Sequence, residues 1–404
     1  MSISARAVLT AVLLAATTTT AQTPLVPAGG SWSDPEKAVR VEIGESVPLV
    51  VAGRDFEGTE IYSRGPFIVI DLDCTLTLRN DSTQRLRAAT FSVLAQRNTA
   101  GGRASVVLPS LNVGPGETFP AKIRMRLLRP LPGPVGELTQ IRVDGVLAAD
   151  LSFVGPDTLK LRRKITLLEI EARRERERLL RVLDGDGDQA LSREMLASLE
   201  RQARRPKLRA RLAGGTGRTV SPSAAAGEER SVTLAFLDLP DAPLALLDGS
   251  AAASGATASS PLFTVRNRSS KAIERFEVGW IIRDSEGTSF GAGSAPAAPP
   301  DAPLAPGASL QAGEPRRYEF SLLDRNQRLS IGGMGGYVRR VEFADGSYWI
   351  PSREELAAAS LLEVEPVSTE GQRLADVYRI KGVDALRSEL ESYRSDFSSA
   401  SSAK

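Results

Sequence analysis

Residues 75–95 read TLTLRNDSTQRLRAATFSVLA, and residues 262–282 read LFTVRNRSSKAIERFEVGWII. The two stretches align without a gap and share an Asn-x-Ser step, at 80–82 in the first and 267–269 in the second. After that step apolar residues alternate with a period of two, which indicates a half-buried strand. Asn and Ser close together favour a turn. Each copy therefore predicts a strand, a polar turn and a second strand.

Turn signals continue on either side of the repeat. Pro-Gly turns at 114–116 and 305–307 come before further apolar strands, and Asp144-Gly145 and Asp345-Gly346 have the composition of hairpin turns. Several short strands separated by turns are typical of a β-sandwich. We therefore expect one sandwich over 40–155 and a second, related one over 230–351.

The second copy resembles FxLYD-type and related immunoglobulin-like domains of bacterial extracytoplasmic proteins. The resemblance rests on VRNRSS at 265–270, DSEG at 284–287 and LAPGAS at 304–309. The first copy keeps the Asn-x-Ser and Pro-Gly turns but has RNTAGG at 97–102 where the Asp-x-x-Gly turn should be. The resemblance implies surface or envelope modules with a binding role. Because it rests on turns, it supports a fold more than an activity.

A helix-loop-helix is predicted over 157–212, between the sandwiches. Asp157 can cap a helix that runs to about residue 183, and its charged stretch EARRERER at 171–178 is expected to face solvent. A second helix starts at Ser192 and ends before Pro206. A flexible linker over 213–229 follows, and a helical tail is expected over 352–404, with its clearest helical pattern at 383–393.

The loop between these helices, DGDGDQALSREM at 184–195, resembles an EF-hand calcium loop. It departs from that pattern in two places: Gln189 stands where the family has Gly, and Met195 stands where the family has a bidentate Glu. Losing the bidentate ligand predicts weak calcium binding. The alternative is a polar turn in which the Asp residues cap and solvate the helix ends. The metal ligands that the resemblance implies are Asp184, Asp186, Asp188, Ala190, Ser192 and Glu194.

The first residues predict export. Arg6, the apolar run 7–16 and the small residues 19–21 form a signal peptide over 1–21, with cleavage before Gln22. The apolar run is shorter than the roughly 20 residues needed to span a bilayer. No later run reaches that length, so we expect no transmembrane segment and a secreted or periplasmic location.

The amino-acid composition excludes several classes of catalysis, metal site and partner. The chain has no histidine, which excludes Ser-His-Asp and Cys-His catalysis and imidazole-bound zinc. A formal net charge of +2 over 404 residues gives no reason to expect nucleic acid as a partner. The single cysteine, Cys74, is expected to be a small buried hydrophobe, with an intermolecular disulfide or a reactive thiol as the alternative.

Several other residues have two interpretations. The basic run 201–211 is either a solvated helix end or a surface for anionic ligands. The Asn-x-Ser steps match glycosylation sequons, but their repetition at turns favours a structural role. Trp280, Tyr348 and Trp349 are expected in the core or on strands, with a ligand surface as the alternative.

The sequence thus predicts a mainly β protein with helical segments: two tandem immunoglobulin-like sandwiches, a helix-loop-helix between them and a C-terminal helical tail. The favoured function is a non-enzymatic interaction or scaffold protein that binds an unknown protein or envelope polymer. One alternative is a hydrolase that uses carboxylates on an envelope or extracellular polymer. Another is a calcium-responsive regulatory subunit.

Overall fold

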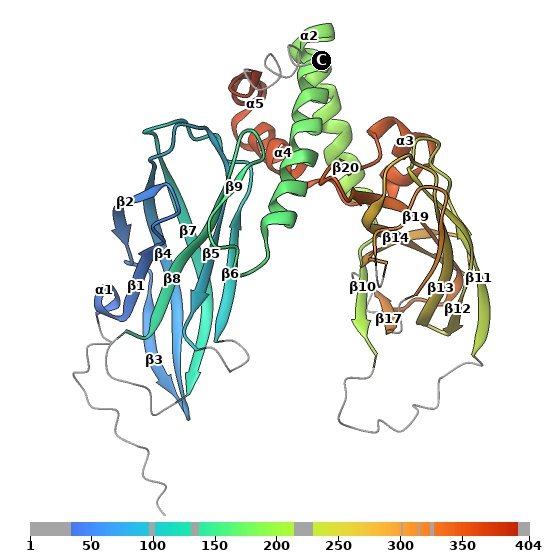
Figure 1. Cartoon of the computed structure of the whole chain (residues 1–404), viewed down its shortest axis with the longest axis horizontal. Coiled ribbons are helices and arrows are strands. Elements are labelled where there is room, and N and C mark those ends of the chain that lie inside the picture. Colours follow the sequence, from blue (N-terminus) through green and yellow to red (C-terminus); the bar gives the residue numbers. More distant parts are fainter. Residues whose placement is uncertain are drawn as a thin grey trace, which may run out of the picture. The chain divides into compact units, whose positions relative to one another are not determined.

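The computed structural model describes residues 34–96, 102–130, 137–213, 229–299, 302–313, 316–323 and 327–394. The predicted signal peptide and residues 214–228 of the predicted linker lie outside these ranges. The chain forms two compact units (Figure 1). Unit 1 takes the described residues of 1–108, 113–146 and 153–160, and unit 2 takes those of 109–112, 147–152 and 161–404. The expected mainly β architecture with helical segments is confirmed.

Unit 1 contains two sheets. One has the order β1-β8-β5-β6, with β9 beside β8; these strands are β1 (Val39–Ile43), β5 (Leu86–Leu94), β6 (Arg103–Leu108), β8 (Thr139–Ala148) and β9 (Phe153–Val154). The short helix α1 (Pro35–Ala38) precedes β1. In the other sheet β4 is central; its strands are β2 (Leu49–Asp55), β3 (Glu60–Arg64), β4 (Phe67–Asn80) and β7 (Thr118–Pro130).

The pattern of β4 explains why these sheets enclose a core. Every second side chain from Ile70 to Leu78 is almost fully buried, whereas the residues between them are partly exposed. Successive side chains of a strand point to opposite faces, so one face of β4 supplies a continuous apolar row. Cys74 lies in this row, and burial raises the pKa of its thiol to about 12. The expectation that Cys74 is a small buried hydrophobe on a strand is therefore confirmed.

Unit 2 is built on a single eleven-stranded sheet. Its path is β10-β17-β13-β12-β11-β19-β14-β15, with β16, β18 and β20 paired at the side. The strands are β10 (Leu208–Leu212), β11 (Arg230–Phe236), β12 (Leu244–Ser254), β13 (Thr257–Asn267), β14 (Ile273–Asp284), β15 (Ser289–Ala297), β16 (Ser309–Gly313), β17 (Arg317–Leu322), β18 (Gln327–Arg328), β19 (Ile331–Phe343) and β20 (Tyr348–Trp349). Strand β11 runs antiparallel to β12 and then parallel to β19, so it joins two layers that share one core.

The two units repeat the same strand pairings. Strand β1 is parallel to β8 as β11 is to β19, and β2 is antiparallel to β4 as β12 is to β13. The repeat seen in the sequence spans β4 and β5 in unit 1 and β13 and β14 in unit 2. Trp280 on β14 is buried edge-to-face against Phe263 in the core of unit 2, as expected.

Asn80 is the centre of the first polar turn. Its side chain is fully buried, and its Nδ2 donates to the carbonyl oxygens of Gln84 (2.8 Å) and Val113 (3.1 Å). Its Oδ1 accepts from the backbone N–H (3.0 Å) and the hydroxyl (2.7 Å) of Ser82. The Gln84 carbonyl, 2.8 Å from the Ser82 Oγ, is an alternative acceptor for the same hydroxyl hydrogen. The amide thus holds three segments together and uses its full hydrogen-bonding capacity.

Asn267 makes the same network in unit 2. Its Nδ2 donates to the carbonyls of Lys271 (2.8 Å) and Leu304 (2.9 Å), and its Oδ1 accepts from the N–H and hydroxyl of Ser269. The expected structural role of both Asn-x-Ser steps is confirmed. A glycan would have to attach to a nitrogen that is fully buried and donates both of its hydrogens.

Asp144-Gly145 is not the hairpin turn that the sequence suggested. Both residues lie inside β8, and the chain reverses after Ala148. Asp144 is buried and accepts hydrogen bonds from Thr158 and Leu159. A Cβ on Gly145 would lie 2.1 Å from the ring of Phe153, so close packing explains this glycine. Asp345-Gly346, in contrast, is the expected turn, between β19 and β20.

The predicted helix-loop-helix is a helical hairpin, α2 (Arg162–Arg204), interrupted at Gly187. Figure 1 draws it as two arms, and an ion pair of 3.1 Å between Arg178 and Glu194 shows that the arms lie side by side. Only Gly187 departs from helical geometry, so the twelve-residue loop expected at 184–195 is nearly all helix. Asp157 is not the cap, because the helix begins at Arg162 and Leu161 holds the N-cap position.

The C-terminal helices pack on this hairpin. They are α3 (Arg353–Ala358), the 3-10 turn Leu361–Glu363, α4 (Thr369–Lys381) and α5 (Val383–Glu391). The helix expected over 383–393 is confirmed as α5. A buried cluster joins both arms of α2 to α4 and α5; it consists of Leu179, Leu180, Leu191, Met195, Leu374, Leu386 and Leu390. Met195, at the position of an EF-hand glutamate, is therefore a core residue.

The charged stretch 171–178 is partly buried rather than solvated. Arg176 is fully buried, donates to Glu169 at 2.8 Å and lies 3.6 Å from Glu370 on α4. Its guanidinium stacks over the ring of Tyr393, 4.0 Å from the centroid. Arg373 holds Glu370 with two hydrogen bonds of 2.9 Å. Sequence alone suggested a solvent face because the partner charges lie some 200 residues away in α4.

No helix in the described ranges has the length and apolarity that crossing a membrane takes.

Candidate functional site: a mixed-charge pocket in unit 2

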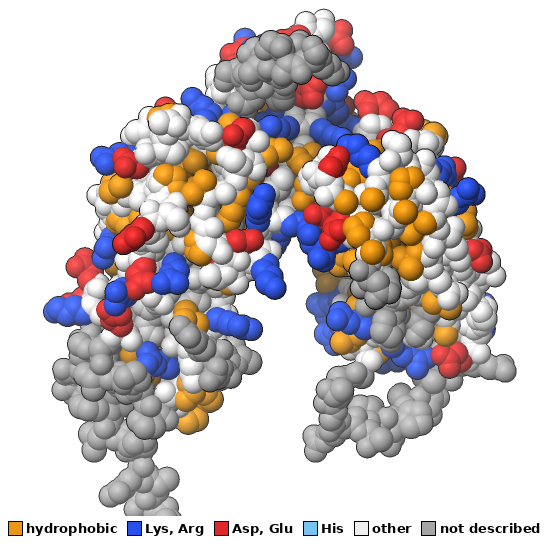
Figure 2. Space-filling model, viewed as in Figure 1, with side chains coloured by type: hydrophobic (Ala, Val, Ile, Leu, Met, Phe, Trp, Pro, Cys, Tyr) orange, Lys and Arg blue, Asp and Glu red, His pale blue; other side chains and the backbone are white. Residues whose placement is uncertain are grey.

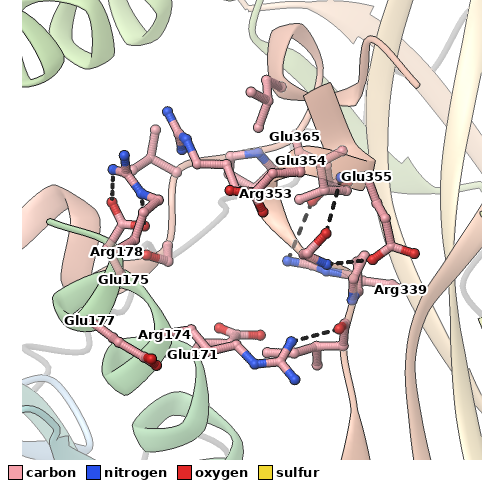
Figure 3. A pocket seen from close by; sticks show the side chains of 18 of the residues that line it. Glu171, Arg174, Glu175, Glu177, Arg178, Arg339, Arg353, Glu354, Glu355 and Glu365 are labelled. Atoms are coloured by element: carbon pink, nitrogen blue, oxygen red, sulfur yellow. Dashed lines mark hydrogen bonds and ion pairs between the residues drawn. The ribbon is translucent and has the colours of Figure 1, made fainter. Parts of the chain in front are cut away.

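A pocket with a volume of about 500 Å³ lies in unit 2 (Figure 3). The first arm of α2 contributes one wall, with Glu171, Arg174, Glu175 and Arg178 at helical spacing. Strands β19 and β20 and the segment from Ile350 to Ser368, which includes α3, contribute most of the rest. Arg201 of the second α2 arm and Asp241, in the loop before β12, complete the lining. Apolar side chains line it among the charges: Trp349, Ile350, Pro351, Leu356, Leu362, Pro366 and Val367. Trp349 lies on a strand, as expected, and also lines the pocket, which is where the alternative interpretation would place it; its neighbour Tyr348 does not line the pocket.

Three arginines converge on one side of the pocket. Arg178, Arg201 and Arg353 lie 3.1, 3.5 and 3.0 Å from the same oxygen of Glu194. Arg178 also donates to Glu175 at 2.8 Å. We call Arg178, Arg201 and Arg353 the arginine cluster. Two carboxylates balance three guanidinium groups there, and Glu194 itself is not part of the lining, so the cluster presents a net positive charge to the pocket.

The opposite side of the pocket has a second charge group, on β19 and its neighbours (Figure 3). Arg339 lies 3.6 Å from Glu365 and donates to the hydroxyl of Ser294 at 2.9 Å. Tyr337 lies beside it, and burial raises the pKa of its hydroxyl. Glu171, on α2, lies 3.9 Å from Arg340, and burial raises the pKa of its carboxyl group despite that cation. Ion pairs and hydrogen bonds therefore hold the charged groups on this side of the pocket in place.

The start of α3 is held rigidly at the pocket. The Ser352 hydroxyl accepts from the Glu355 N–H at 3.1 Å, and the Glu355 carboxylate accepts from the Ser352 N–H at 2.7 Å. This capping box fixes the first turn of the helix, where Arg353 and Glu354 lie. Arg174 donates to the carbonyl of Ile350 at 2.6 Å and ties the same segment to α2. The charged groups are therefore preorganised.

Four charged residues remain available at the pocket. Arg181, Glu177, Asp241 and Glu354 are exposed and form no ion pair within the described part of the chain. Three of the four are acidic. The pocket thus combines a positive cluster, an acidic rim and apolar patches, an arrangement that suits a ligand carrying both signs of charge.

The residues expected to bind calcium are not gathered around one point. Asp184 pairs with Arg394 at 2.7 Å, and Asp188 pairs with Arg387. Asp186 is exposed, Ala190 is buried in the hairpin and Ser192 lies within the helix rather than at its cap. Glu194 belongs to the arginine cluster. Nowhere in the ranges described do three or more acidic or sulfur ligands come together as a metal site.

Comparisons with known proteins give no family. No family model matches the chain, and no curated protein matches it. Among solved structures, a hypothetical protein from Peptoclostridium difficile 630 is 15% identical, with 34% of this chain and 98% of that chain covered and a TM-score of 0.19. Red sea bream transglutaminase is 10% identical, with 69% and 30% covered and a TM-score of 0.11. An allantoicase is 8% identical, with 72% and 90% covered and a TM-score of 0.09. TM-scores this low carry no argument about function.

Sequence reasoning missed this pocket, although two signals for it are present. The stretch 171–178 repeats charges at one helical spacing, and Ser352-Arg-Glu-Glu355 is a capping-box sequence. What the sequence could not give is the convergence of two α2 arms and α3. That convergence depends on the reversal at Gly187.

Proposed function

We propose that this chain is a secreted or periplasmic, non-enzymatic interaction protein and that its binding site is the mixed-charge pocket of unit 2. The signal-peptide sequence supports the location. Two sandwiches with repeated pairings support a modular binding role, because this architecture serves recognition in many unrelated proteins.

One observation carries the proposal: most of the carboxylates that line the pocket or lie beside it are held by ion pairs or hydrogen bonds, as the charged groups of a recognition surface are. The carboxylates of Glu175, Glu194 and Glu365 each face an arginine, and Glu355 is occupied by the capping box. A carboxylate that is paired with arginine stays ionised and is a poor general acid. Recognition of a charged partner needs such fixed, ionised groups.

Isolation of the protein from the extracytoplasmic fraction tests the proposal. We expect the mature chain to begin at Gln22, and we expect it to be recovered with a bound partner after mild cross-linking. Recovery of an intact Met1 terminus from the cytosol, or of the chain without any partner, would contradict the proposed function.

Glu171 favours a second candidate, a carboxylate-dependent hydrolase. It lines the pocket, and its raised pKa is the property of a general acid. Assays on envelope and extracellular polymers with the wild type and Glu171→Gln distinguish the two functions. Hydrolysis that is lost in Glu171→Gln would establish the hydrolase, whereas binding retained in Glu171→Gln would support the interaction protein.

A further inference from the structure

We infer that the mixed-charge pocket takes a protein segment in which an acidic and a basic side chain are separated by apolar ones. This inference rests on the proposed function and names its ligand class. The acidic side chain is seated on the arginine cluster, Arg178, Arg201 and Arg353. The basic side chain faces Glu354 of α3, one of the three exposed acidic residues that line the pocket; Glu177, on α2, lies on another side of it (Figure 3).

The arginine cluster already shows the chemistry that it accepts. Three guanidinium groups from two helix arms and α3 surround one carboxylate oxygen of Glu194, at 3.0 to 3.5 Å. Arginine forms forked hydrogen bonds that match a carboxylate. Arg178 is occupied by Glu194 and, through Nε and Nη2, by Glu175. Among the described residues the ion pairs of Arg201 and Arg353 are with Glu194 alone, and both arginines line the pocket. A carboxylate of the partner would neutralise the one positive charge of the arginine cluster that Glu194 and Glu175 do not balance.

The acidic rim excludes a uniform polyanion. Glu177, Asp241 and Glu354 are exposed at the pocket and form no ion pair among the described residues. A nucleic acid or an acidic polysaccharide would bring negative charge against them at every repeat, which costs binding energy. Acidic and basic side chains are also interspersed over the face drawn in Figure 2, without a broad basic surface. A peptide can place one charge of each sign, with apolar side chains between them.

The apolar part of the lining fits the same ligand. Trp349, Leu356 and Val367 line the pocket together with its charged groups. Apolar side chains of a peptide that contact these residues add burial to the charge pairs. Neither a free phosphate nor a simple carboxylate offers that contact.

Selection from a random-peptide display library on the full mature chain tests the inference. We expect enriched peptides to carry an acidic and a basic residue separated by apolar ones. Their affinity for Arg353→Gln should fall about tenfold or more, because a charge-assisted hydrogen bond is lost. Arg204→Gln is the matched control: Arg204 lies on the α2 hairpin outside the pocket lining, is exposed and, among the described residues, pairs with Glu200 alone. It should leave the affinity unchanged.

Glu354→Lys separates binding from folding. Glu354 is exposed and forms no ion pair with the residues that the structure describes, so its substitution should lower the unfolding temperature only slightly, through the charge at the first turn of α3, while it shifts the selected peptides away from basic residues. Enrichment of peptides without acidic residues, equal affinity for Arg353→Gln, or displacement of the peptides by polyphosphate or oligogalacturonate at similar charge would overturn the inference. A partner recovered from the extracytoplasmic fraction that binds Arg353→Gln as well as wild type would leave the proposed function standing and remove only this ligand assignment.

Discussion

Asn80 and Asn267 are the residues that connect the sequence repeat to the fold. Each is fully buried and supplies two donors to carbonyls of separate loops and one acceptor to a serine two residues on. A buried polar group is stable only when such partners are present. The same short motif therefore closes the same corner of both units.

Replacing either asparagine with alanine should destabilise its unit by about 2–5 kcal/mol, because two buried carbonyls lose their donors. The two substitutions remove equivalent networks, so we expect similar losses. Denaturant unfolding of Asn80→Ala and Asn267→Ala, each compared with wild type, measures them. A loss below about 0.5 kcal/mol in either variant would show that water replaces the amide.

The buried carboxylate of Glu370 gives a prediction with a defined pH dependence. Burial opposes its ionisation, but the hydrogen bonds and charge of Arg373, with Arg176, outweigh burial and lower the pKa of Glu370 below its ordinary value of 4.5. Ionised Glu370 therefore contributes stability that is fully present above pH 4.5 and is lost as the pH falls through the lowered pKa.

Glu370→Gln should cost about 1–3 kcal/mol at neutral pH, because Arg176 and Arg373 each lose one carboxylate partner and, among the described residues, keep only Glu169 and Glu389. The difference from wild type should shrink as the pH falls below 4.5. Unfolding free energies measured across that range check both statements. Glu200→Gln, which breaks an exposed pair with Arg204, should change stability by less than about 1 kcal/mol. A loss for Glu370→Gln that does not vary with pH would contradict the assignment.

At the scale of elements, the α2 hairpin depends on one glycine. Gly187 has φ 69° and ψ −166°, a region open almost only to glycine, and an added Cβ would meet no atom within 4 Å. The reversal brings Arg201 and Glu194 back to Arg178 and so builds one wall of the pocket. Gly185, two residues earlier, has equally open surroundings but no positive φ.

Gly187→Ala should therefore destabilise the hairpin by about 1–3 kcal/mol through backbone strain alone. Gly185→Ala should instead stabilise it by about 0.5–1 kcal/mol, because alanine is the better helix former. Thermal unfolding of both variants gives opposite signs if the hairpin turns at Gly187. Equal effects would mean that the break is not fixed at that residue.

Calcium binding at the hairpin tip stays a prediction, and the structure sharpens it. A calcium ion at 184–195 has to displace Arg394 from Asp184 and Arg387 from Asp188. We expect calorimetric titration of the mature chain to give a dissociation constant no tighter than about 10⁻⁴–10⁻³ M. The double variant Arg387→Ala, Arg394→Ala should bind more tightly. If calcium titration of neither protein gives heat above that of dilution, the hypothesis of calcium binding is wrong.

At the scale of the whole molecule, the sequence predicts what local chemistry determines. The alternating strands around each Asn-x-Ser turn predicted the mainly β fold and its repeat, which the structure has as β4–β5 and β13–β14. The pattern at 383–393 predicted α5. Three features escaped, each for a non-local reason. Residues 171–178 are partly buried because their partners lie in α4, Asp144-Gly145 is a strand because Phe153 packs on it, and Met195 is core because the hairpin folds onto α4 and α5.

The central claim is that the pocket of unit 2 binds a protein segment, and photo-cross-linking tests it most directly. A photoreactive amino acid at position 354 stands at the rim without disturbing an ion pair. In the intact extracytoplasmic fraction we predict a cross-link to one protein, at a peptide containing an acidic residue, that is lost when Arg201 and Arg353 are changed to Gln. The same cross-link in that double variant, or a cross-linked polysaccharide in place of a peptide, would contradict the account.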